Sequence, residues 1–405
     1  MDWEGGEQPN QRVRGFLYKV SMKILYIANI RLPTEKAHGI QIMKMCEAFA
    51  HLGHTVELVV PDRRTPITED PFSYYGVERT FSITRLPTLD AVSWGRAGFW
   101  LQALSFIFYA ARHVRRSSAE VVYSRDPALF FFGRMPLDKA LIWEIHTKPT
   151  LRAVEKIRES HVRVVAISGG LRDVLIKAGV PSGRITVAHD AVDADMFAQV
   201  LDRQMVRKEL SLPEEKKLVA YIGKYKTMGE SKGVEDIISA VGRLRDTHST
   251  VGLLLAGLNQ DEFSEVRNLV SAAGLEDAAH LVGHVGHNQV AQYMRAADVL
   301  VMNYPNTEHY ARFMSPLKLF EYMASGTPIV TSDLPSIREV LSDASAFFFK
   351  VDDPDSLRRA IEVVLANPAE ASQKATTALS EAREHTWQKR AKDIMEFACK
   401  TKKMI

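Results

Sequence analysis

Short apolar runs alternate with helix-like segments twice along the chain of 405 residues, and this double alternation limits the possible folds most strongly. The first series of expected strands is Lys23–Ala28, Thr55–Val60, Glu120–Tyr123, Leu141–Ile145, Val162–Ile167 and Arg184–Ala188. The second series is Leu218–Ile222, Val251–Ala256, Ala279–Val282, Val299–Met302, Pro328–Thr331 and Ala346–Phe349. Such runs are typical of parallel strands that are buried on both faces. The pattern therefore predicts an α/β protein with two parallel sheets in sequence.

The segments outside the two series set the expected domain boundaries. Residues 1–21 contain acidic residues and two adjacent glycines but no apolar core of a signal peptide, so we expect a disordered extension ahead of Met22. Polar residues after the last strand of the first series indicate a boundary near Phe197. We expect a first domain over residues 22–197, a second over 198–384, and a terminal helix within 385–405.

The composition excludes several classes of protein. Apolar residues make up 46% and charged residues 25% of the chain, which is typical of a globular protein. The net charge of +3 is too small to indicate a nucleic-acid partner. Two cysteines, Cys46 and Cys399, form neither a disulfide framework nor a metal cluster, which fits a reducing cytoplasm.

The stretch from Met314 to Val330 predicts a short helix followed by a buried strand. Ser315 can cap the helix, Pro316 suits its first position, and Gly326 suits a left-handed residue after its end. One side would carry Leu317, Phe320, Met323 and Ala324, and the other Lys318, Glu321, Tyr322 and Ser325. A polar front on a helix between buried strands indicates a ligand or another domain. A surface helix with a solvated polar face is the alternative.

The start of this helix is also an expected phosphate site, because a helix N-terminus offers unpaired N–H groups and a positive dipole end. Lys224 and Lys232 follow the first strand of the second series, close in topology to Ser315. Two ammonium groups and the helix start would bind a diphosphate, with roughly 1.5–3 kcal/mol for each charge-assisted bond. Glu321, one turn further along, could accept hydrogen bonds from sugar hydroxyls.

Two polar residues follow strands of the first domain, where parallel sheets place their ligand crevice. His146 follows Leu141–Ile145, and Arg125 follows Glu120–Tyr123. His146 is either a ligand contact or a histidine bonded within the crevice wall. Arg125 either contacts the ligand or forms a structural ion pair with Asp126.

Residues 97–116 form the most apolar long segment. Ala97 to Ala111 precedes Arg112, Arg115 and Arg116, and is too short to span a bilayer, which needs about 20 apolar residues. One interpretation is a core helix between strands. The other is a helix that also contacts an anionic membrane surface, with its arginines at headgroup level. The second would place the protein at the inner face of the plasma membrane.

No Gly-x-Gly-x-x-Gly follows the first expected strand, which argues against a dinucleotide cofactor. Other motifs are the loop ending at Gly39, Glu-Ile-His at 144–146, Val-Ala-Ile-Ser at 165–168, Gly-Lys at 223–224, Lys-Gly at 232–233, and the Glu321 helix with Ser-Gly-Thr-Pro-Ile-Val at 325–330. In their order and spacing the chain from Met22 onward resembles family 4 of the retaining, nucleotide-sugar-dependent glycosyltransferases. The resemblance implies the GT-B fold, in which two Rossmann-like domains face each other across a cleft and a C-terminal helix crosses back to the first domain.

The resemblance also implies roles for single residues. His146 would contact the donor sugar, and Lys224 and Lys232 would stabilise the departing nucleoside diphosphate, so these three would be catalytic. The implied donor-binding residues are Gly39, Gly223, Val282, His284, Ser315, Pro316, Leu317, Lys318 and Glu321. Glu321 would bind the ribose, and residues 282–285 the base. The acceptor-side loop would contribute Asn29, Arg31, Glu35 and Lys36.

The implied reaction moves a sugar from a UDP- or GDP-linked donor to an acceptor, such as a lipid-linked or cell-surface glycan precursor, with retention of configuration. The nucleotide sugar is a co-substrate, and no other cofactor is expected. Asp193-Ala194-Asp195 has the Asp-x-Asp pattern that can hold Mg²⁺ or Mn²⁺. Because it falls at the expected domain boundary, we expect no metal.

The chain departs from the family pattern in three places. Phe313 stands where the family usually has a glutamate near the donor sugar, which indicates altered sugar recognition. Met314-Ser315-Pro316 replaces a glycine-rich stretch, and Ala191 replaces the glycine of a Gly-Val-Asp corner. Two alternatives remain open: a nucleotide-sugar epimerase of similar fold, and a non-catalytic nucleotide-sugar-binding relative.

Overall fold

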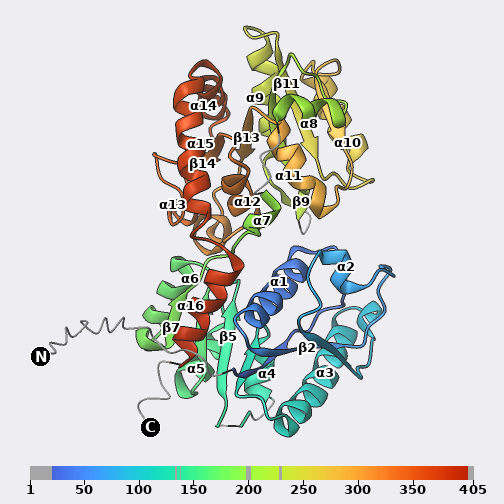
Figure 1. Ribbon diagram of the computed structural model, residues 1–405, viewed down its shortest axis with the longest axis vertical. Helices are drawn as coiled ribbons and strands as arrows, with labels where there is room; N and C mark the ends of the chain where they lie inside the picture. Colours follow the sequence, from blue (N-terminus) through green and yellow to red (C-terminus); the bar gives the residue numbers. More distant parts are fainter. Residues whose placement is uncertain (1–20, 133–134, 137, 198–201, 228–229, 400–405) are drawn as a thin grey trace, which may run out of the picture.

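The computed structural model describes residues 21–132, 135–136, 138–197, 202–227 and 230–399 (Figure 1). The strands are β1 (Lys23–Ile27), β2 (Thr55–Pro61), β3 (Ser82–Leu86), β4 (Val121–Ser124), β5 (Ala140–Ile145), β6 (Arg163–Ala166), β7 (Ile185–Val187), β8 (Lys217–Ile222), β9 (Lys226–Thr227), β10 (Glu230–Ser231), β11 (Val251–Ala256), β12 (Ala279–Val282), β13 (Val299–Met302), β14 (Ile329–Ser332) and β15 (Phe347–Phe349).

The helices are α1 (Ala37–His51), α2 (Pro71–Tyr75), α3 (Arg96–Arg116), α4 (Pro127–Phe132), α5 (Leu151–Glu159), α6 (Gly169–Lys177), α7 (Ala194–Phe197), α8 (Arg203–Glu209), α9 (Val234–Arg245), α10 (Phe263–Ala272), α11 (His287–Ala296), α12 (Leu317–Ser325), α13 (Pro335–Arg338), α14 (Pro354–Ala366), α15 (Pro368–Ala382) and α16 (Trp387–Cys399). Short 3₁₀ turns η1 (Val92–Trp94) and η2 (Ser182–Arg184) and one π-helical turn η3 (His309–Phe313) complete the order. The expected disorder of residues 1–21 falls almost wholly on residues 1–20, which lie outside the described ones.

Two parallel sheets organise the molecule, which confirms the predicted α/β class. The first has the order β3-β2-β1-β4-β5-β6-β7, and the second β12-β11-β8-β13-β14-β15. In each sheet the first strand in sequence has an interior position. The next two strands of the sheet extend it on one side of that strand, and the later strands extend it on the opposite side. Ligands of parallel sheets bind beyond the carboxyl ends of the strands at this reversal. The reversals lie between β1 and β4 and between β8 and β13.

Side chains that alternate along the central strands fill cores on both faces of each sheet. Ile24 and Tyr26 of β1 enter one apolar cluster, and Leu25 and Ile27 enter the other. β8 divides its side chains between two clusters in the same way. This double burial explains why continuous apolar runs located most strands correctly. The strand β3 was missed because it lies at the sheet edge, partly exposed, with no apolar run.

The C-terminal helix returns to the first domain, as the fold class predicted. Trp387, Ala391 and Ile394 of α16 belong to the same buried cluster as Ile24 of β1. Figure 1 shows α16 beside α1, among the elements of the N-terminal half. The helix α16 therefore follows the second domain in the chain and packs against the first domain.

The helix α12 is buried on nearly every side, so the interpretation of a solvated surface helix is wrong. Lys318 and Tyr322, from its predicted polar front, are buried, as is Phe320 on its apolar back. Gly326 ends the helix with a φ of 65°, as predicted. Ser315 does not cap it, because the helix starts after Pro316 and the hydroxyl is used elsewhere.

The helix α3 covers one face of the first sheet, where Phe106, Ala110 and Val114 lie in the core. The core-helix interpretation therefore holds for this inner face, while the outer face is exposed. Within the described residues, no helix combines the length and the apolar character that crossing a membrane requires.

Candidate functional site

Glycines at the carboxyl edge of the second sheet bring several predicted donor residues together. The chain leaves β8 through Gly223, whose φ of 144° favours glycine. A Cβ at Gly223 would lie 2.7 Å from Nζ of Lys318, and a Cβ at Gly257, which follows β11, would lie 3.0 Å from the Gly223 backbone. Both glycines are therefore needed for α12 and the loops after β8 and β11 to approach so closely.

Lys318, the second residue of α12, is only 9% exposed and carries its ammonium group into this edge. Nζ lies 3.3 Å from the centroid of the Tyr221 ring, so the ring face stabilises its charge. No described residue offers Nζ a hydrogen-bond acceptor. Burial, reinforced by the charge of Lys232, lowers the pKa of Lys318 well below its usual range. A buried donor without an acceptor is rare and indicates a ligand position.

Lys232 and Lys224 add two further ammonium groups to the same edge. Burial and the nearby charge of Lys224 lower the pKa of Lys232 to about 8. The effect of Lys224 on Lys232 indicates that the two ammonium groups are electrostatic neighbours. Nζ of Lys224 donates to the backbone oxygen of Glu35, 3.3 Å away in the acceptor-side loop of the first domain. The cationic edge therefore faces the opposite domain.

The start of α12 lies at the same edge, where a diphosphate contact is predicted. Among the described residues no side chain caps this helix, so its N-terminal dipole has no side-chain partner there. Lys318 on the first turn of α12 feels the charge of Lys232, and Lys232 feels that of Lys224, so the three lysines are neighbours of this helix start. Glu321 lies one turn further along α12, partly exposed. The structure thus brings together Lys224, Lys232, Lys318, Gly223 and Glu321.

Val282 ends the strand β12, and His284 lies in the loop that follows it. The carbonyl oxygen of Val282 accepts hydrogen bonds from the amides of Gly257 and Leu258, at 3.2 and 3.3 Å. His284 is exposed. The loop therefore adjoins Gly257 and, through it, Gly223, on the side where the base contact is predicted.

Ser315, Pro316 and Leu317 connect α12 to the first domain. The Ser315 hydroxyl accepts a hydrogen bond of 2.8 Å from the backbone amide of Asp190. Leu317 packs against the first-domain cluster that contains Ile24. The predicted donor residues at this helix start are therefore also held by contacts across the cleft.

His146 is positioned by a buried network in the first domain. Its Nε2 bonds the carboxylate of Glu144, which is fully buried in β5. Glu144 also accepts from Tyr123, from Nε2 of Gln41 at 2.5 Å and from Nη2 of Arg390 at 3.0 Å. Burial alone would raise the pKa of Glu144, but Arg390 and His146 hold it well below its usual range.

His146 is neutral at physiological pH. Burial and the charge of Arg125 lower its pKa to about 4, despite the Glu144 carboxylate. A neutral imidazole has one donor and one acceptor nitrogen. Because Nε2 meets a carboxylate, it carries the proton, and Nδ1 is left as an acceptor.

Arg125 does not form the structural ion pair considered from the sequence. Its Nη1 donates to Oε1 of Gln41 at 2.7 Å. Asp126 instead accepts from the amide of Ala128 at 3.0 Å at the start of α4, and the salt bridges of the described residues include no Arg125–Asp126 pair. Arg125 therefore belongs to the network around His146.

Two members of this region were missed by the sequence analysis. Arg390 of α16 donates to Glu144 and to the carbonyl oxygens of Ala188 and His189. The signal in the sequence that could have identified Arg390 is that it is a single arginine on the otherwise apolar face of the terminal helix. Asp190 follows β7, and burial raises its pKa to about 6. No described residue hydrogen-bonds its Oδ1.

The acceptor-side loop lies over the edge of the first sheet. Oδ1 of Asn29 accepts from Nε2 of Gln102 at 2.8 Å, which ties the loop to α3. Arg31 and Glu35 form an ion pair of 2.6 Å, and Lys36 precedes α1. The hydrogen bond to α3 and the ion pair within the loop together give the loop a defined shape.

Gly39 lies in the first turn of α1, which begins at Ala37, so the loop that was expected to end at Gly39 ends at Lys36. A Cβ at Gly39 would overlap the Tyr75 hydroxyl, which itself bonds the backbone of Thr34. The glycine is therefore required by packing within the first domain. Contact with a donor diphosphate stays a prediction.

Phe313, the departure from the family pattern, ends the π-helical turn η3 and is 2% exposed. It belongs to the apolar cluster of the first domain that contains Ile145 and Leu171. Nζ of Lys148 lies 5.8 Å from its ring centroid. The phenylalanine thus packs into the opposite domain.

The α6 N-terminus makes a second contact between the domains. Both Gly169 and Gly170 donate their amides to the Glu339 carboxylate, at 2.7 and 3.3 Å. The Ser168 hydroxyl donates to the carbonyl oxygen of Arg312 at 3.0 Å, and a Cβ at Gly170 would overlap that oxygen. A cavity of about 410 Å³ adjoins these residues and His189.

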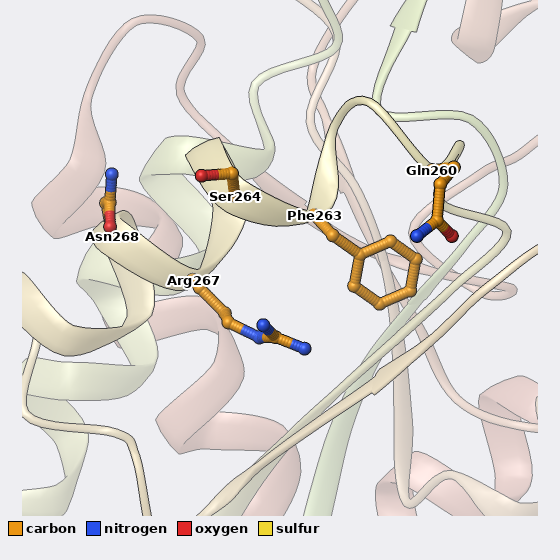
Figure 2. A pocket seen from close by; sticks show the side chains of 5 residues that line it. All are labelled: Gln260, Phe263, Ser264, Arg267 and Asn268. Carbon is orange, nitrogen blue, oxygen red and sulfur yellow. The ribbon is translucent and has the colours of Figure 1, made fainter.

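A larger cavity, of about 600 Å³, lies beside α10. It is lined by Gln260, Phe263, Ser264, Arg267 and Asn268. Figure 2 shows the Phe263 ring and the Arg267 guanidinium projecting to the same side of the helix. A Cβ at Gly283 would lie 3.8 Å from the ring, so the cavity borders the predicted base loop but contains none of the predicted site residues.

The Asp-x-Asp pattern is used for structure at its first position. Asp193 accepts a bond of 2.7 Å from Nζ of Lys44. Within the described residues, no three His, Cys, Asp or Glu side chains are grouped as metal ligands. Independence of a metal stays a prediction.

Comparison with known proteins relates both halves of the chain to glycosyltransferases. Residues 39–196 match the family Glycosyltransferase Family 4, and residues 202–383 match Glycosyl transferases group 1. Glycogen synthase of Mycobacterium tuberculosis is 28% identical over 232 residues, which are 56% of this chain and 51% of that protein. Phosphatidyl-myo-inositol mannosyltransferase of Mycolicibacterium smegmatis is 30% identical over 155 residues, 38% of this chain and 37% of that protein. The chain thus spans about half the length, or less, of these curated relatives.

A solved structure extends the likeness to nearly the whole fold. HepE of Anabaena, in complex with UDP and glucose, superposes with a TM-score of 0.71 at 16% identity, covering 95% of this chain and 100% of that one. At this identity the likeness concerns the fold. The first half of the chain thus matches Glycosyltransferase Family 4, the second half matches Glycosyl transferases group 1, and the two facing α/β domains have the GT-B fold.

Proposed function

We propose that this protein transfers a glycosyl unit from a nucleoside diphosphate sugar to an acceptor, with retention of the anomeric configuration. The observation that carries the proposal is the ammonium group of Lys318, buried at the start of α12 without an acceptor among the described residues. Lys224 and Lys232 add positive charge beside it, which is what a diphosphate requires. UDP in the similar HepE structure supports a uridine donor, and GDP remains the second choice.

The three lysines would act on the leaving group. As the bond between the anomeric carbon and the diphosphate oxygen breaks, negative charge grows on that oxygen, and preorganised cations stabilise it. The acceptor oxygen forms the new bond on the same face, and its proton passes to the departing phosphate. Fixed ammonium groups supply the charge that a divalent cation supplies elsewhere, so we expect activity without a metal.

His146 would orient the donor sugar. Because Nε2 is bonded to Glu144, a neutral ring offers Nδ1 as an acceptor for a sugar hydroxyl. Phe313 occupies a first-domain core, so the usual glutamate contact to the sugar is absent and other groups must recognise it.

The acceptor would enter past Asn29, Arg31, Glu35 and Lys36. A lipid-linked glycan precursor is the acceptor that we favour. We place the protein in the cytoplasm, at the inner face of the plasma membrane.

Product analysis tests this function. The protein is incubated with UDP-glucose or GDP-mannose, with and without a panel of glycan and lipid-linked acceptors, in the presence of EDTA. Release of nucleoside diphosphate together with a retained linkage on one acceptor is expected, and EDTA should not change the rate. An epimerised donor formed without an acceptor would assign the protein to the epimerases. Tight donor binding without turnover on any acceptor would assign it to non-catalytic binders.

A further inference from the structure

The outer face of α3 carries a row of large apolar side chains. Trp100, Leu104 and Phe108 are spaced by four residues, so they share one face of the helix, and they are 56%, 50% and 63% exposed. Leu101 lies beside them and Trp94 directly precedes the helix, both exposed. A helix that covers a sheet normally turns its polar side outward. This helix is apolar on both sides, so its outer face lacks the partner that its composition requires.

Positive charge borders the row. Arg112 and Arg115 continue it by one further turn, and Arg96 and Arg116 lie at the helix ends, all exposed. The helix contains no aspartate or glutamate. None of the four arginines forms an ion pair with a described residue. The face therefore combines an apolar row with an excess of cations.

The row lies close to the acceptor-side loop. The side chain of Gln102, on the inner side of α3, bonds Asn29 of that loop. Because α3 connects the parallel strands β3 and β4, it runs against them and starts at the edge where the cleft lies. Figure 1 shows α3 on the outer side of the first domain. A flat surface that contacts α3 would therefore lie beside the entrance to the acceptor side.

We propose that this face of α3 docks the protein on membranes that contain anionic lipids. The tryptophans, the leucines and the phenylalanine enter the boundary between headgroups and acyl chains, where amphipathic aromatic rings are favoured. The arginines meet lipid phosphates, which complement four cations on a face without an acidic residue. The helix lies in the membrane surface and does not cross it.

Membrane docking does not depend on the donor site. Only its use, delivery of a lipid-linked acceptor to the loop at Asn29, rests on the proposed function. Vesicle binding and nucleotide binding can be measured separately, so failure of one leaves the other testable.

Co-sedimentation with vesicles tests the proposal. The vesicles contain either phosphatidylcholine alone or phosphatidylcholine mixed with phosphatidylglycerol. A Leu104→Glu, Phe108→Glu double variant changes two exposed residues and should fold normally. Leu151→Glu on α5 is the matched control, because Leu151 is 80% exposed but lies outside the row. An Arg112→Gln, Arg115→Gln variant removes charge alone.

We expect the wild type and Leu151→Glu to bind the anionic vesicles more tightly than the neutral ones. The double glutamate variant should lose roughly a hundredfold in affinity, because two large apolar side chains no longer enter the lipid. The double glutamine variant should lose roughly fivefold for each arginine on anionic vesicles alone. Equal binding by wild type and double glutamate variant, or no binding by the wild type, would overturn the proposal. A wild-type dimer that the glutamates dissociate, without vesicle binding, would assign the face to a second copy instead.

Discussion

The proposed function predicts that nucleotide binding depends on pH through Lys232. Its pKa of about 8 lies below the usual value, so the ammonium loses its proton as the pH rises through this region. A bound diphosphate then loses one cationic partner. We expect the affinity for UDP to fall by up to tenfold per pH unit above about pH 8, because one pKa unit corresponds to about 1.4 kcal/mol. Titration calorimetry from about pH 7 to about pH 9.5 measures the profile.

A Lys232→Arg variant is the matched control. Its guanidinium stays charged over the whole range, so its affinity should hardly change with pH. The phosphate of UDP is already ionised there. A wild-type profile as flat as that of the variant would show that Lys232 does not contact the nucleotide.

The three lysines also show which properties of a single residue can be predicted from the sequence. Lys224 and Lys232 were predicted from their places after a strand and beside glycines. Helical periodicity placed Lys318 on the polar side of α12, without indicating its burial. Its surroundings come from Tyr221 and Gly223, almost a hundred residues away, so only the fold reveals that its charge lacks a partner.

At the scale of elements, α16 depends on Arg390. Its guanidinium is buried and pairs with the buried Glu144 carboxylate at 3.0 Å. Replacement by methionine would leave that carboxylate without its cation, which typically costs about 3–5 kcal/mol. We therefore expect Arg390→Met to lower the free energy of unfolding by about this amount, measured by urea denaturation. Lys389→Met, at the exposed neighbouring position, should change it by less than about 0.5 kcal/mol.

A Glu144→Gln change separates pairing from simple packing. In the Arg390→Met background the neutral amide removes the unpaired charge, so the double variant should regain part of the lost stability. If Arg390→Met alone were as stable as the Lys389→Met control, the buried pair would not hold α16. The pKa of Glu144 is lower in the folded protein than in the unfolded chain. The stability that this carboxylate contributes is therefore present above the unfolded-chain pKa and is lost as the pH falls through the folded-state pKa.

Elements with a continuous apolar run were predicted well, and those without one were not. The limits of β11 and β13 agree with the predicted strands, because both are buried along their whole length, and those of the half-buried edge strand β12 agree as well. The edge strand β3 and the turn α2 lack such runs. Contrary to the prediction, the helix α12 does not start with Ser315 as its cap, because the Ser315 hydroxyl bonds Asp190 of the other domain. The local sequence does not show this partner.

At the scale of the whole molecule, Phe313 locks the two domains together. It belongs to the second half of the chain but lies in a first-domain core. Phe313→Ala should cost up to about 3–5 kcal/mol and loosen the contact between the domains. Small-angle scattering should show a larger radius of gyration, and denaturation should show a lower midpoint. Phe132→Ala removes an exposed ring of α4 and should change neither.

If Phe313→Ala left both measurements unchanged, the residue would be a sequence variation without a role in closure. The sequence predicted two facing domains and a returning helix, because apolar runs and motif order are local properties. It did not predict the contacts that close the cleft. Those of Phe313, Ser315 and Glu339 join residues that are more than a hundred positions apart.

The central claim is that the lysines and α12 form the site of a nucleoside diphosphate. Thermal unfolding with UDP, GDP and ADP and their common sugar conjugates tests it most directly. We compare the wild type with a Lys232→Ala, Glu321→Ala double variant and with Lys226→Ala. The last is the control, because the Lys226 ammonium forms an ion pair with Glu265 of α10.

One nucleotide family should raise the midpoint of the wild type and of the control. At a hundred times the dissociation constant, ligand binding adds about 2.7 kcal/mol to stability. The double variant should show no shift at the same concentration. No shift with any nucleotide, or an equal shift in the double variant, would contradict the account.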